Sequence, residues 1–282
     1  MITTDFLHQL DRFDLVVHKR VTSNYAGEKR SIAEGRGLVF KDHRIYAPGD
    51  DIREIDWKVY ARTDDLYVKR YEEERNLTVH IIIDCSASMN FGKNVTKFEY
   101  AAMLGIGFAY LALKENEKFQ VSTFSDDLVL IRPKRGLGQL ASVVENLNNV
   151  KVQGFSKFAE AMFKYKKIIN TRSLIVILSD FLVNLEDIKT ALYLFGKHEL
   201  KVIQILDPVE KEFILTGDLR LHDSETKEML KTSISPRVRM LYQSKLAQHA
   251  AEIEKICKKL GVDFYSVTTD KPIFDAFYDI LK

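Results

Sequence analysis

Apolar runs alternate with amphipathic segments along the chain after residue 77. The apolar runs, many of them rich in β-branched residues, predict strands at 77–84, 118–124, 128–132, 174–178, 201–206 and 262–267. Apolar residues three or four positions apart predict helices at about 97–114, 137–148, 157–169, 185–195 and 237–259. Apolar strands that alternate with helices are typical of an α/β fold. We therefore expect a doubly wound, mostly parallel sheet with Rossmann-type layering and helices on both faces.

The first 76 residues have a different texture. Apolar residues at helical spacing predict an amphipathic helix over 5–18. Residues 20–75 are dense in charges of both signs and lack a long helical period, so they predict short strands and turns. We expect an N-terminal accessory region of short strands and a helix over residues 1–76.

A second departure from the alternating pattern lies near 207–234. Pro208, Gly217 and the alternating stretch 219–222 predict a small hairpin at this point. The long helix that follows ends before Gly261, a residue type that commonly terminates helices. The predicted organisation is therefore an accessory region at 1–76 and an α/β domain at 77–282 with a hairpin insertion.

Composition narrows the class of protein without indicating its function. The chain has 282 residues, of which 46% are hydrophobic and 29% charged, as is ordinary for a globular protein. A formal net charge of +2 gives no case for nucleic-acid binding or for attraction to a membrane surface. The longest apolar run, 101–113, is too short to span a membrane. Residues 1–14 lack the layout of a signal peptide. The two cysteines are too few for a disulfide framework, which favours a reducing compartment. We therefore expect a cytoplasmic protein.

The most informative polar residues follow the first apolar strand. Asp84, Ser86 and Ser88 are two positions apart, so in extended backbone their side chains point the same way. One carboxylate and two hydroxyls on one side of a loop suit a small hard cation such as Mg²⁺. The simpler alternative is turn chemistry, because Asp and Ser commonly close turns and cap helices. Cys85 alternates away from this direction, so we interpret it as a buried small side chain.

Two later segments extend the candidate site. Asp180 follows the apolar run 174–178, and the carboxyl ends of neighbouring parallel strands meet at the sheet edge where α/β proteins bind ligands. Ser156 lies in a turn after Gly154. Its hydroxyl could join the site, or it could be the N-cap of the helix that begins near Lys157.

An acidic stretch at 48–57 begins with a predicted Pro-Gly turn. Its carboxylates could form a second acidic site, but we favour a structural clasp in which they pair with Arg53 and Arg62. Trp57 is interpreted as a core anchor of the accessory region.

The Asp-x-Ser-x-Ser motif, the later hydroxyl and the Asp after a further strand resemble a von Willebrand factor A domain. In that family these groups form a metal-ion-dependent adhesion site. Asp84, Ser86 and Ser88 match the first motif, Asp180 matches the third, and Ser156 stands where the family usually has Thr. The resemblance implies a Mg²⁺ (or Mn²⁺) site made of these five residues.

A longer resemblance covers residues 35–92. The matching stretches are Tyr46–Trp57, Ala61–Arg62, Val68–Arg75 and Asp84–Gly92. They resemble the bacterial "domain of unknown function 58" family, which carries a von Willebrand A-like fold. The resemblance implies a link with MoxR-type AAA+ ATPases, and it identifies the fold better than the function.

Three functional hypotheses follow. We prefer a non-enzymatic, metal-dependent protein-binding adaptor, in which a partner's Asp or Glu fills an open coordination position. The resemblance implies that this partner is a MoxR-type AAA+ ATPase or its client, in complex assembly or maturation. The alternative is a magnesium-dependent hydrolase of phosphate esters, with Asp84 and Asp180 holding the ion, although no His or Lys in the motifs is placed as general acid or base. The third is a structural fold with an empty site.

Overall fold

The computed structural model describes residues 6, 9–11, 39–72, 78–131, 136–213, 217–226 and 228–282. The chain forms two compact units. The larger comprises Met1–Val17 and Leu77–Lys282, and the smaller comprises His18–Asn76. No helix within the described residues is long and apolar enough to cross a membrane.

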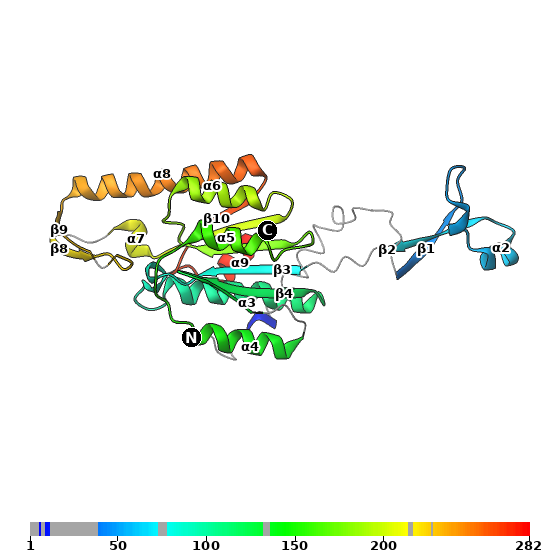
Figure 1. Ribbon diagram of the computed structural model, residues 1–282, viewed down its shortest axis with the longest axis horizontal. Coiled ribbons are helices and arrows are strands. Elements are labelled where there is room, and N and C mark those ends of the chain that lie inside the picture. Colours follow the sequence, from blue (N-terminus) through cyan, green and yellow to red (C-terminus); the bar gives the residue numbers. More distant parts are fainter. Residues whose placement is uncertain are drawn as a thin grey trace. The chain divides into compact units, whose positions relative to one another are not determined.

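A six-stranded sheet forms the centre of the larger unit (Figure 1). Its strand order is β10–β7–β6–β3–β4–β5, and every neighbouring pair is parallel except β4 with β5. The predicted doubly wound, mostly parallel sheet is therefore confirmed. The strands are β3 (Thr78–Asp84), β4 (Lys118–Phe124), β5 (Leu128–Leu130), β6 (Leu174–Ser179), β7 (Glu199–Leu206) and β10 (Asp263–Thr268).

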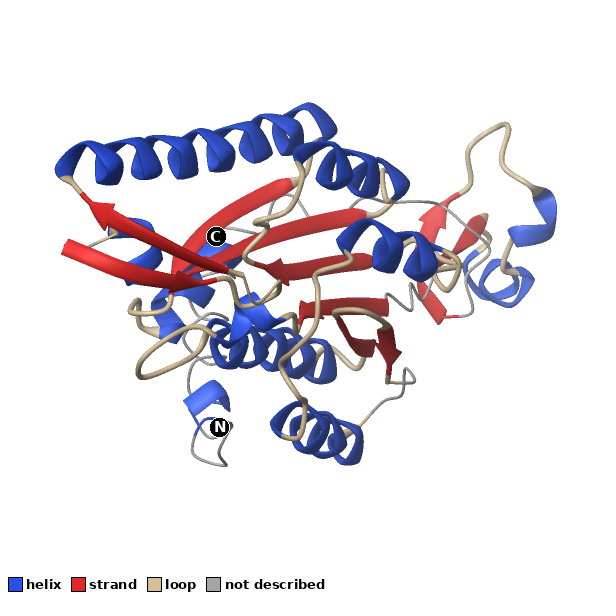
Figure 2. Ribbon diagram, turned by 60° about the vertical axis from the view of Figure 1, so that its left-hand side comes forward, coloured by secondary structure: helices blue, strands red, loops and turns tan. Residues whose placement is uncertain are grey.

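Helices cover both faces of this sheet. Ile81 and Ile83 of β3 pack in one apolar layer with α3, α4 and α9, whereas Ile82 packs in the other with α5, α6 and α8. Figure 1 shows α3 and α4 on one side of the sheet and α6 and α8 on the other, and Figure 2 shows the strands between them. The helices are α3 (Lys97–Lys114), α4 (Leu137–Asn148), α5 (Phe158–Lys166), α6 (Leu185–Leu194), α8 (Pro236–Leu260) and α9 (Ile273–Leu281).

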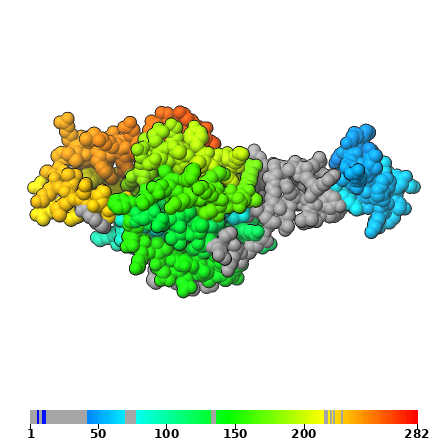
Figure 3. Space-filling model, viewed as in Figure 1, coloured from blue at the N-terminus to red at the C-terminus, as the bar shows by residue number. Residues whose placement is uncertain are grey.

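The segment 207–234 contains a short helix, α7 (Pro208–Glu212), and a hairpin. The hairpin pairs β8 (Gly217–His222) with β9 (Met229–Ile234) in antiparallel register and leads directly into α8. In the space-filling view the hairpin (yellow) and the start of α8 (orange) form one end of the larger unit (Figure 3).

Residues near the N-terminus belong to the larger unit, which differs from the predicted accessory region of 1–76. Phe6 and Leu10 are buried in the apolar layer of α3 and α9, and the Phe6 ring lies 5.8 Å from that of Phe274. The Tyr110 hydroxyl of α3 donates a hydrogen bond to Asp11. Phe6 and Leu10 thus help to cover the core of the α/β domain, and most of the helix predicted over 5–18 lies outside the described residues.

The smaller unit pairs β1 (Val39–Ile45) with β2 (Tyr67–Glu72) in an antiparallel ladder. Between these strands lie a 3₁₀ turn, η1 (Ile52–Glu54), and α2 (Trp57–Thr63), a helix too short for periodicity to predict. The prediction that Trp57 anchors the core is wrong. Trp57 is the first residue of α2, and its ring makes an edge contact with that of Tyr60. The residue is 56% exposed.

Within the described residues, Asp50 and Asp56 pair with cations other than the guanidinium groups of Arg53 and Arg62, and the Arg53 amide donates to Asp51 at 3.0 Å. Asp50 pairs with Arg44 at 2.8 Å. Asp56 lies 3.0 Å from the His43 ring and 3.6 Å from the Lys69 ammonium. The hydrogen bond from His43 lowers the pKa of Asp56 to about 2. Because these partners lie on β1 and β2, the carboxylates tie the intervening turns to the ladder.

A buried histidine makes the stability of the larger unit depend on pH. His80 in β3 has its Nδ1 atom 2.9 Å from the Tyr165 hydroxyl, and burial lowers its pKa from 6.5 to about 4. In the folded state His80 stays neutral down to about pH 4, whereas in the unfolded chain it takes up a proton below about pH 6.5. We expect this group to lower the free energy of unfolding by about 3 kcal/mol between about pH 7 and pH 4.

Chemical denaturation of the wild type and His80→Gln across this range measures the effect. Glutamine keeps a polar group near Tyr165 but does not titrate. The unfolding free energy of the variant should therefore fall less steeply as the pH decreases. Equal slopes for the two proteins would show that His80 is protonated in the folded state at little cost.

Candidate metal centre

Asp84 ends the central strand β3, between the neighbouring strands β4 and β6. Its side chain is fully buried. The Ser86 amide donates to Oδ1 at 2.9 Å, and the hydroxyls of Ser156 and Ser179 each donate to Oδ2 at 2.8 Å. Neutral donors from three separate segments of the chain therefore hold this carboxylate.

Ser86 and Ser88 lie directly after the strand, at the start of a 3₁₀ turn, η2 (Ala87–Asn90). Ser86 is buried, Ser88 is half-buried, and their Oγ atoms are 3.1 Å apart. Both hydroxyls thus lie on one side of the loop, but Ser88 belongs to a 3₁₀ turn and not to the extended backbone assumed from the sequence. Ser86 stands at the N-cap of η2 without a side-chain bond to that turn, so capping does not account for its hydroxyl.

The loop 153–157 carries a third hydroxyl to the same place. The Ala87 amide donates to the Gly154 carbonyl at 2.9 Å, which ties this loop to the end of β3. Gly154 has a φ of +90°, and a Cβ atom there would lie 2.1 Å from Asp126 Oδ2, so the loop requires glycine.

Ser156 is not the N-cap of the following helix. Helix α5 begins at Phe158, and Lys157 occupies its N-cap position. The Ser156 hydroxyl instead donates to Asp84. Of the two roles considered for this residue, the N-cap role is wrong, and the role in a metal site stays a prediction.

Asp180 follows β6 and pairs with a buried lysine. Lys97 has no exposed surface, and its Nζ atom lies 2.8 Å from Asp180 Oδ2 and 2.8 Å from Glu210 Oε1. Lys97 is the first residue of α3, where the helix dipole disfavours a positive charge. The two carboxylates compensate both this effect and the burial of the ammonium group.

The strand-end aspartates differ in their electrostatic surroundings. Burial and the nearby charge of Asp180 raise the pKa of Asp84 above its ordinary value. Burial lowers the pKa of Lys97, but attraction to Asp180 and Glu210 outweighs this, so its pKa is raised and the ammonium stays charged. Within the described part of the chain, no cation pairs with Asp84 in this way, so its negative charge is the less compensated of the two.

This donor set fits a hard divalent cation. Asp84, Ser86, Ser88 and Ser156 form one hydrogen-bonded group of oxygen donors, and Asp180 lies close enough to raise the pKa of Asp84. Oxygen ligands are those that Mg²⁺ and Mn²⁺ prefer. Among the described residues there is no group of three or more His, Cys, Asp or Glu that could hold a metal. A site here therefore depends on its hydroxyls.

Sequence reasoning missed three residues beside the predicted ligands: Lys97, Ser179 and Glu210. Ser179 could have been found, because the parallel register of β3 with β6 places it beside Asp84. Lys97 gave a weaker signal, as a lysine inside a capping box at the start of an apolar helix. No local pattern links it to Glu210, because 113 positions separate the two residues.

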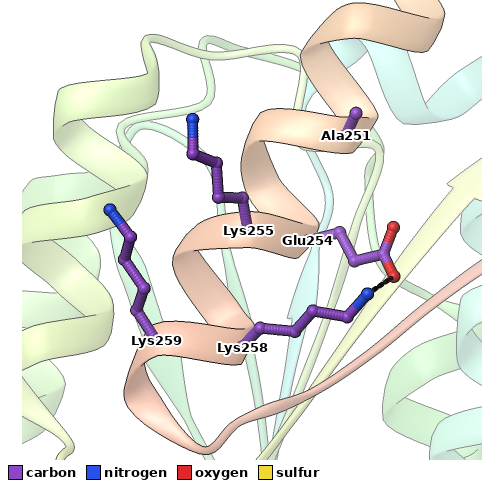
Figure 4. A pocket seen from close by; sticks show the side chains of 5 residues that line it. All are labelled: Ala251, Glu254, Lys255, Lys258 and Lys259. Carbon is purple, nitrogen blue, oxygen red and sulfur yellow. Dashed lines mark ion pairs between the residues drawn. The ribbon is translucent and has the colours of Figure 1, made fainter.

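A separate pocket lies along α8, away from these residues (Figure 4). Its lysines are exposed, and Lys258 pairs with Glu254 at 2.6 Å. Such an arrangement is ordinary for the solvated face of a helix. The lining residues are Ala251, Glu254, Lys255, Lys258 and Lys259.

The sheet order, together with an Asp-x-Ser-x-Ser motif at the end of the central strand, defines a von Willebrand A-like α/β domain. Within this class, the chain belongs to the family described as "Protein of unknown function DUF58", whose model matches residues 42–252. The family resemblance seen in the motifs is thereby confirmed.

Similar proteins include the uncharacterized protein Rv1480 of Mycobacterium tuberculosis (strain ATCC 25618 / H37Rv) and the uncharacterized protein Mb1516 of Mycobacterium bovis. Each is 25% identical over 278 residues, which cover 97% of this chain and 87% of the relative. Similar solved structures include the conserved hypothetical protein BatB from Bacteroides thetaiotaomicron, with 15% identity, a TM-score of 0.44 and coverage of 73% of this chain and 97% of that one. An aerotolerance-related membrane protein from Bacteroides fragilis has 16% identity, a TM-score of 0.47 and coverage of 73% and 96%.

Replacement of the buried lysine tests its structural role. Lys97→Met leaves Asp180 and Glu210 without their cation, and removal of one partner from a buried ion pair typically costs about 3–5 kcal/mol. Lys114→Met, at the other end of α3, removes an exposed ammonium that pairs with Asp11, and we expect a loss of about 1 kcal/mol or less. Urea denaturation of both variants measures the difference. Similar losses would show that Lys97 is not the charge on which this packing depends.

Proposed function

We propose that this protein is a non-enzymatic adaptor that binds a partner protein through a metal-dependent adhesion site. Asp84, Ser86, Ser88, Ser156 and Asp180 would hold Mg²⁺ or Mn²⁺, and the bound ion would offer an open coordination position to an Asp or Glu of the partner. The observation that supports this most directly is the state of Asp84. This carboxylate is fully buried, and all of its hydrogen-bond donors named above are neutral groups. Burial raises its pKa.

The pairing of Asp180 with Lys97 bears on what such a site would bind. Because Lys97 offsets one of the two aspartates, the ligand set carries less negative charge than two unpaired carboxylates would. A cation held mainly by hydroxyls and Asp84 keeps a strong attraction for a further carboxylate. This favours capture of an acidic side chain over tight storage of the metal.

The family resemblance supplies the class of partner, a MoxR-type AAA+ ATPase or its client, and the process, complex assembly or maturation. We place this activity in the cytoplasm. Cys85 and Cys257 are both free and buried, which suits a reducing compartment.

Mg²⁺ or Mn²⁺ should raise the melting temperature of the wild type, because a ligand of the native state stabilises it. At a free metal concentration of about 100 times Kd, the gain is about 2.7 kcal/mol. Asp84→Asn keeps the shape but removes the charge, so we expect this gain to disappear. Asp127→Asn changes an exposed aspartate after β4 and should respond like the wild type. Thermal unfolding over a metal titration measures this, and equal responses of the two variants would contradict the site.

Partner binding should depend on the same aspartate. Loss of a desolvated ionic contact typically costs about 2–5 kcal/mol, so Asp84→Ala should weaken affinity for the MoxR-type ATPase by roughly 30-fold or more. Calorimetry at constant Mg²⁺ is the suitable measurement, since nucleotide binding by the ATPase itself uses this ion. Asp127→Ala is the matched control.

Unchanged affinity of Asp84→Ala would exclude a metal-bridged contact. Turnover of a phosphate ester that disappears in this variant would instead favour the hydrolase alternative.

A further inference from the structure

The first turn of α8 carries a positive charge where a helix favours a negative one. Arg237 is the second residue of this helix, and the partial positive charge of the helix N-terminus disfavours a cation there. The turn holds no acidic residue, and α8 has none before Glu252. Lys97 stands at a similar position in α3, but Asp180 and Glu210 compensate it. Arg237 forms no ion pair with a described residue, so its charge is left without such compensation.

The hairpin at the same end of the larger unit contains a second conflict of this kind (Figure 3). Arg220 of β8 lies directly opposite Lys231 of β9 in the antiparallel register, and both side chains are exposed. Like charges at opposite positions destabilise a ladder. Neither cation forms an ion pair within the described part of the chain. Two separate elements therefore present positive charge that the neighbouring side chains do not neutralise.

Exposed apolar side chains accompany these cations. Met240 and Leu241 are 63% and 57% exposed. They follow Arg237 by three and four positions, so the three side chains are neighbours on one face of α8. On the hairpin, Met229 and Leu230 of β9 are exposed as well. Exposed apolar surface bordered by polar residues is typical of interaction sites. This end of the larger unit thus combines apolar surface with positive charge.

We propose that this surface docks an acidic, apolar segment of a partner protein. The α8 docking surface consists of Arg220, Lys231, Arg237, Met240 and Leu241. Carboxylates of the partner neutralise the cations of both elements, and its apolar side chains cover those of α8. The inference goes beyond the proposed adhesion site, because these residues are not among the predicted metal ligands and the contact needs no metal.

The distribution of charge on the hairpin favours a protein over a nucleic acid or an anionic membrane. Asp218, Asp223 and Glu228 are exposed on the same hairpin as two of the cations. A phosphate backbone or an anionic lipid surface presents negative charge throughout, so these carboxylates repel it. A protein segment can place its acidic groups opposite the cations alone. Apolar side chains such as Met240 and Leu241 also add little to contacts with phosphates.

The two charge conflicts predict that the free protein gains stability when they are removed. Arg237→Glu places an acidic residue in the first turn of α8, and Lys231→Glu places opposite charges across the ladder. Each substitution should raise the melting temperature by about 1–2 °C and should weaken binding of an acidic partner. A cation that serves only the fold would give the reverse result, a lower melting temperature, and that result would contradict the proposal.

A synthetic peptide is a suitable probe for binding by the full chain. The peptide forms an amphipathic helix with leucines on one face and glutamates on the other, and fluorescence anisotropy measures its affinity. Arg237→Glu replaces attraction by repulsion and should weaken binding about tenfold. Leu241→Ser removes apolar contact area and should weaken it about fivefold. Binding should decrease as the salt concentration rises, and it should persist in EDTA.

Lys255→Glu is the matched control for these variants. Lys255 is exposed on the same helix, about 27 Å from Arg237 along its axis, and it pairs with Glu252 at 3.3 Å. Its substitution changes the net charge as much as Arg237→Glu does. We expect it to leave peptide affinity within about twofold of the wild type and to give no rise in melting temperature.

The outcomes decide both the surface and its ligand. Peptide binding that persists in EDTA, that Arg237→Glu and Leu241→Ser weaken, and that Lys255→Glu leaves unchanged establishes the α8 docking surface. No binding at millimolar peptide, or equal weakening by Lys255→Glu, overturns it. Tighter binding to duplex DNA or to phosphatidylglycerol vesicles overturns the assignment to a protein. Self-association of the wild type that Arg237→Glu abolishes would assign the surface to a second copy of this chain instead.

Discussion

One buried ammonium group connects the segments on which the candidate site depends. Lys97, at the start of α3, contacts Asp180 after β6 and Glu210 in α7. A buried charge is stable only with well-placed partners, so these residues have to assemble together for the start of α3 to pack against the sheet. Helix α3 in turn forms much of the apolar layer over Ile81 and Ile83 of β3. The same ion pairs therefore position the covering helix and the sheet edge at which Asp84 lies.

Because Lys97 contacts Asp180 and not Asp84, the negative charges of the two strand-end aspartates are compensated to different extents. Asp180 has a cation within hydrogen-bond distance, whereas Asp84, equally buried, has hydroxyl and amide donors. Neutral donors stabilise a carboxylate less than an ammonium does, so burial still raises the pKa of Asp84. Either a proton or a cation can relieve this imbalance, and a group of three serine oxygens beside the carboxylate favours the cation. In this sense the metal affinity that we propose for the site would follow from which aspartate Lys97 contacts.

The sequence predicted those features that local periodicity controls. The ranges of α3, α4 and β4 agree with the apolar pattern because the layers on each side of the sheet set that pattern. The hydroxyls of Ser86 and Ser88 do lie together, but a 3₁₀ turn brings them there and not the strand period on which the prediction was based. Contacts between distant segments could not be predicted in this way, since the partners of Lys97 depend on the order of strands in the sheet. Trp57 was assigned wrongly for a related reason: whether a large aromatic residue is buried depends on what covers it, not on its neighbours in the chain.

A hairpin beside the carboxyl edge changes what that edge can select. The open edge of an α/β sheet is accessible to water and to any acidic group, so a metal there has little means of discriminating among carboxylates. A lone acidic side chain offers nothing further to recognise, whereas a protein that also contacts the hairpin or the exposed start of α8 would. Met240 and Leu241 are exposed on that first part of α8 and extend the surface available to such a partner. Selectivity at this site would then come from that surrounding surface and not from the metal itself.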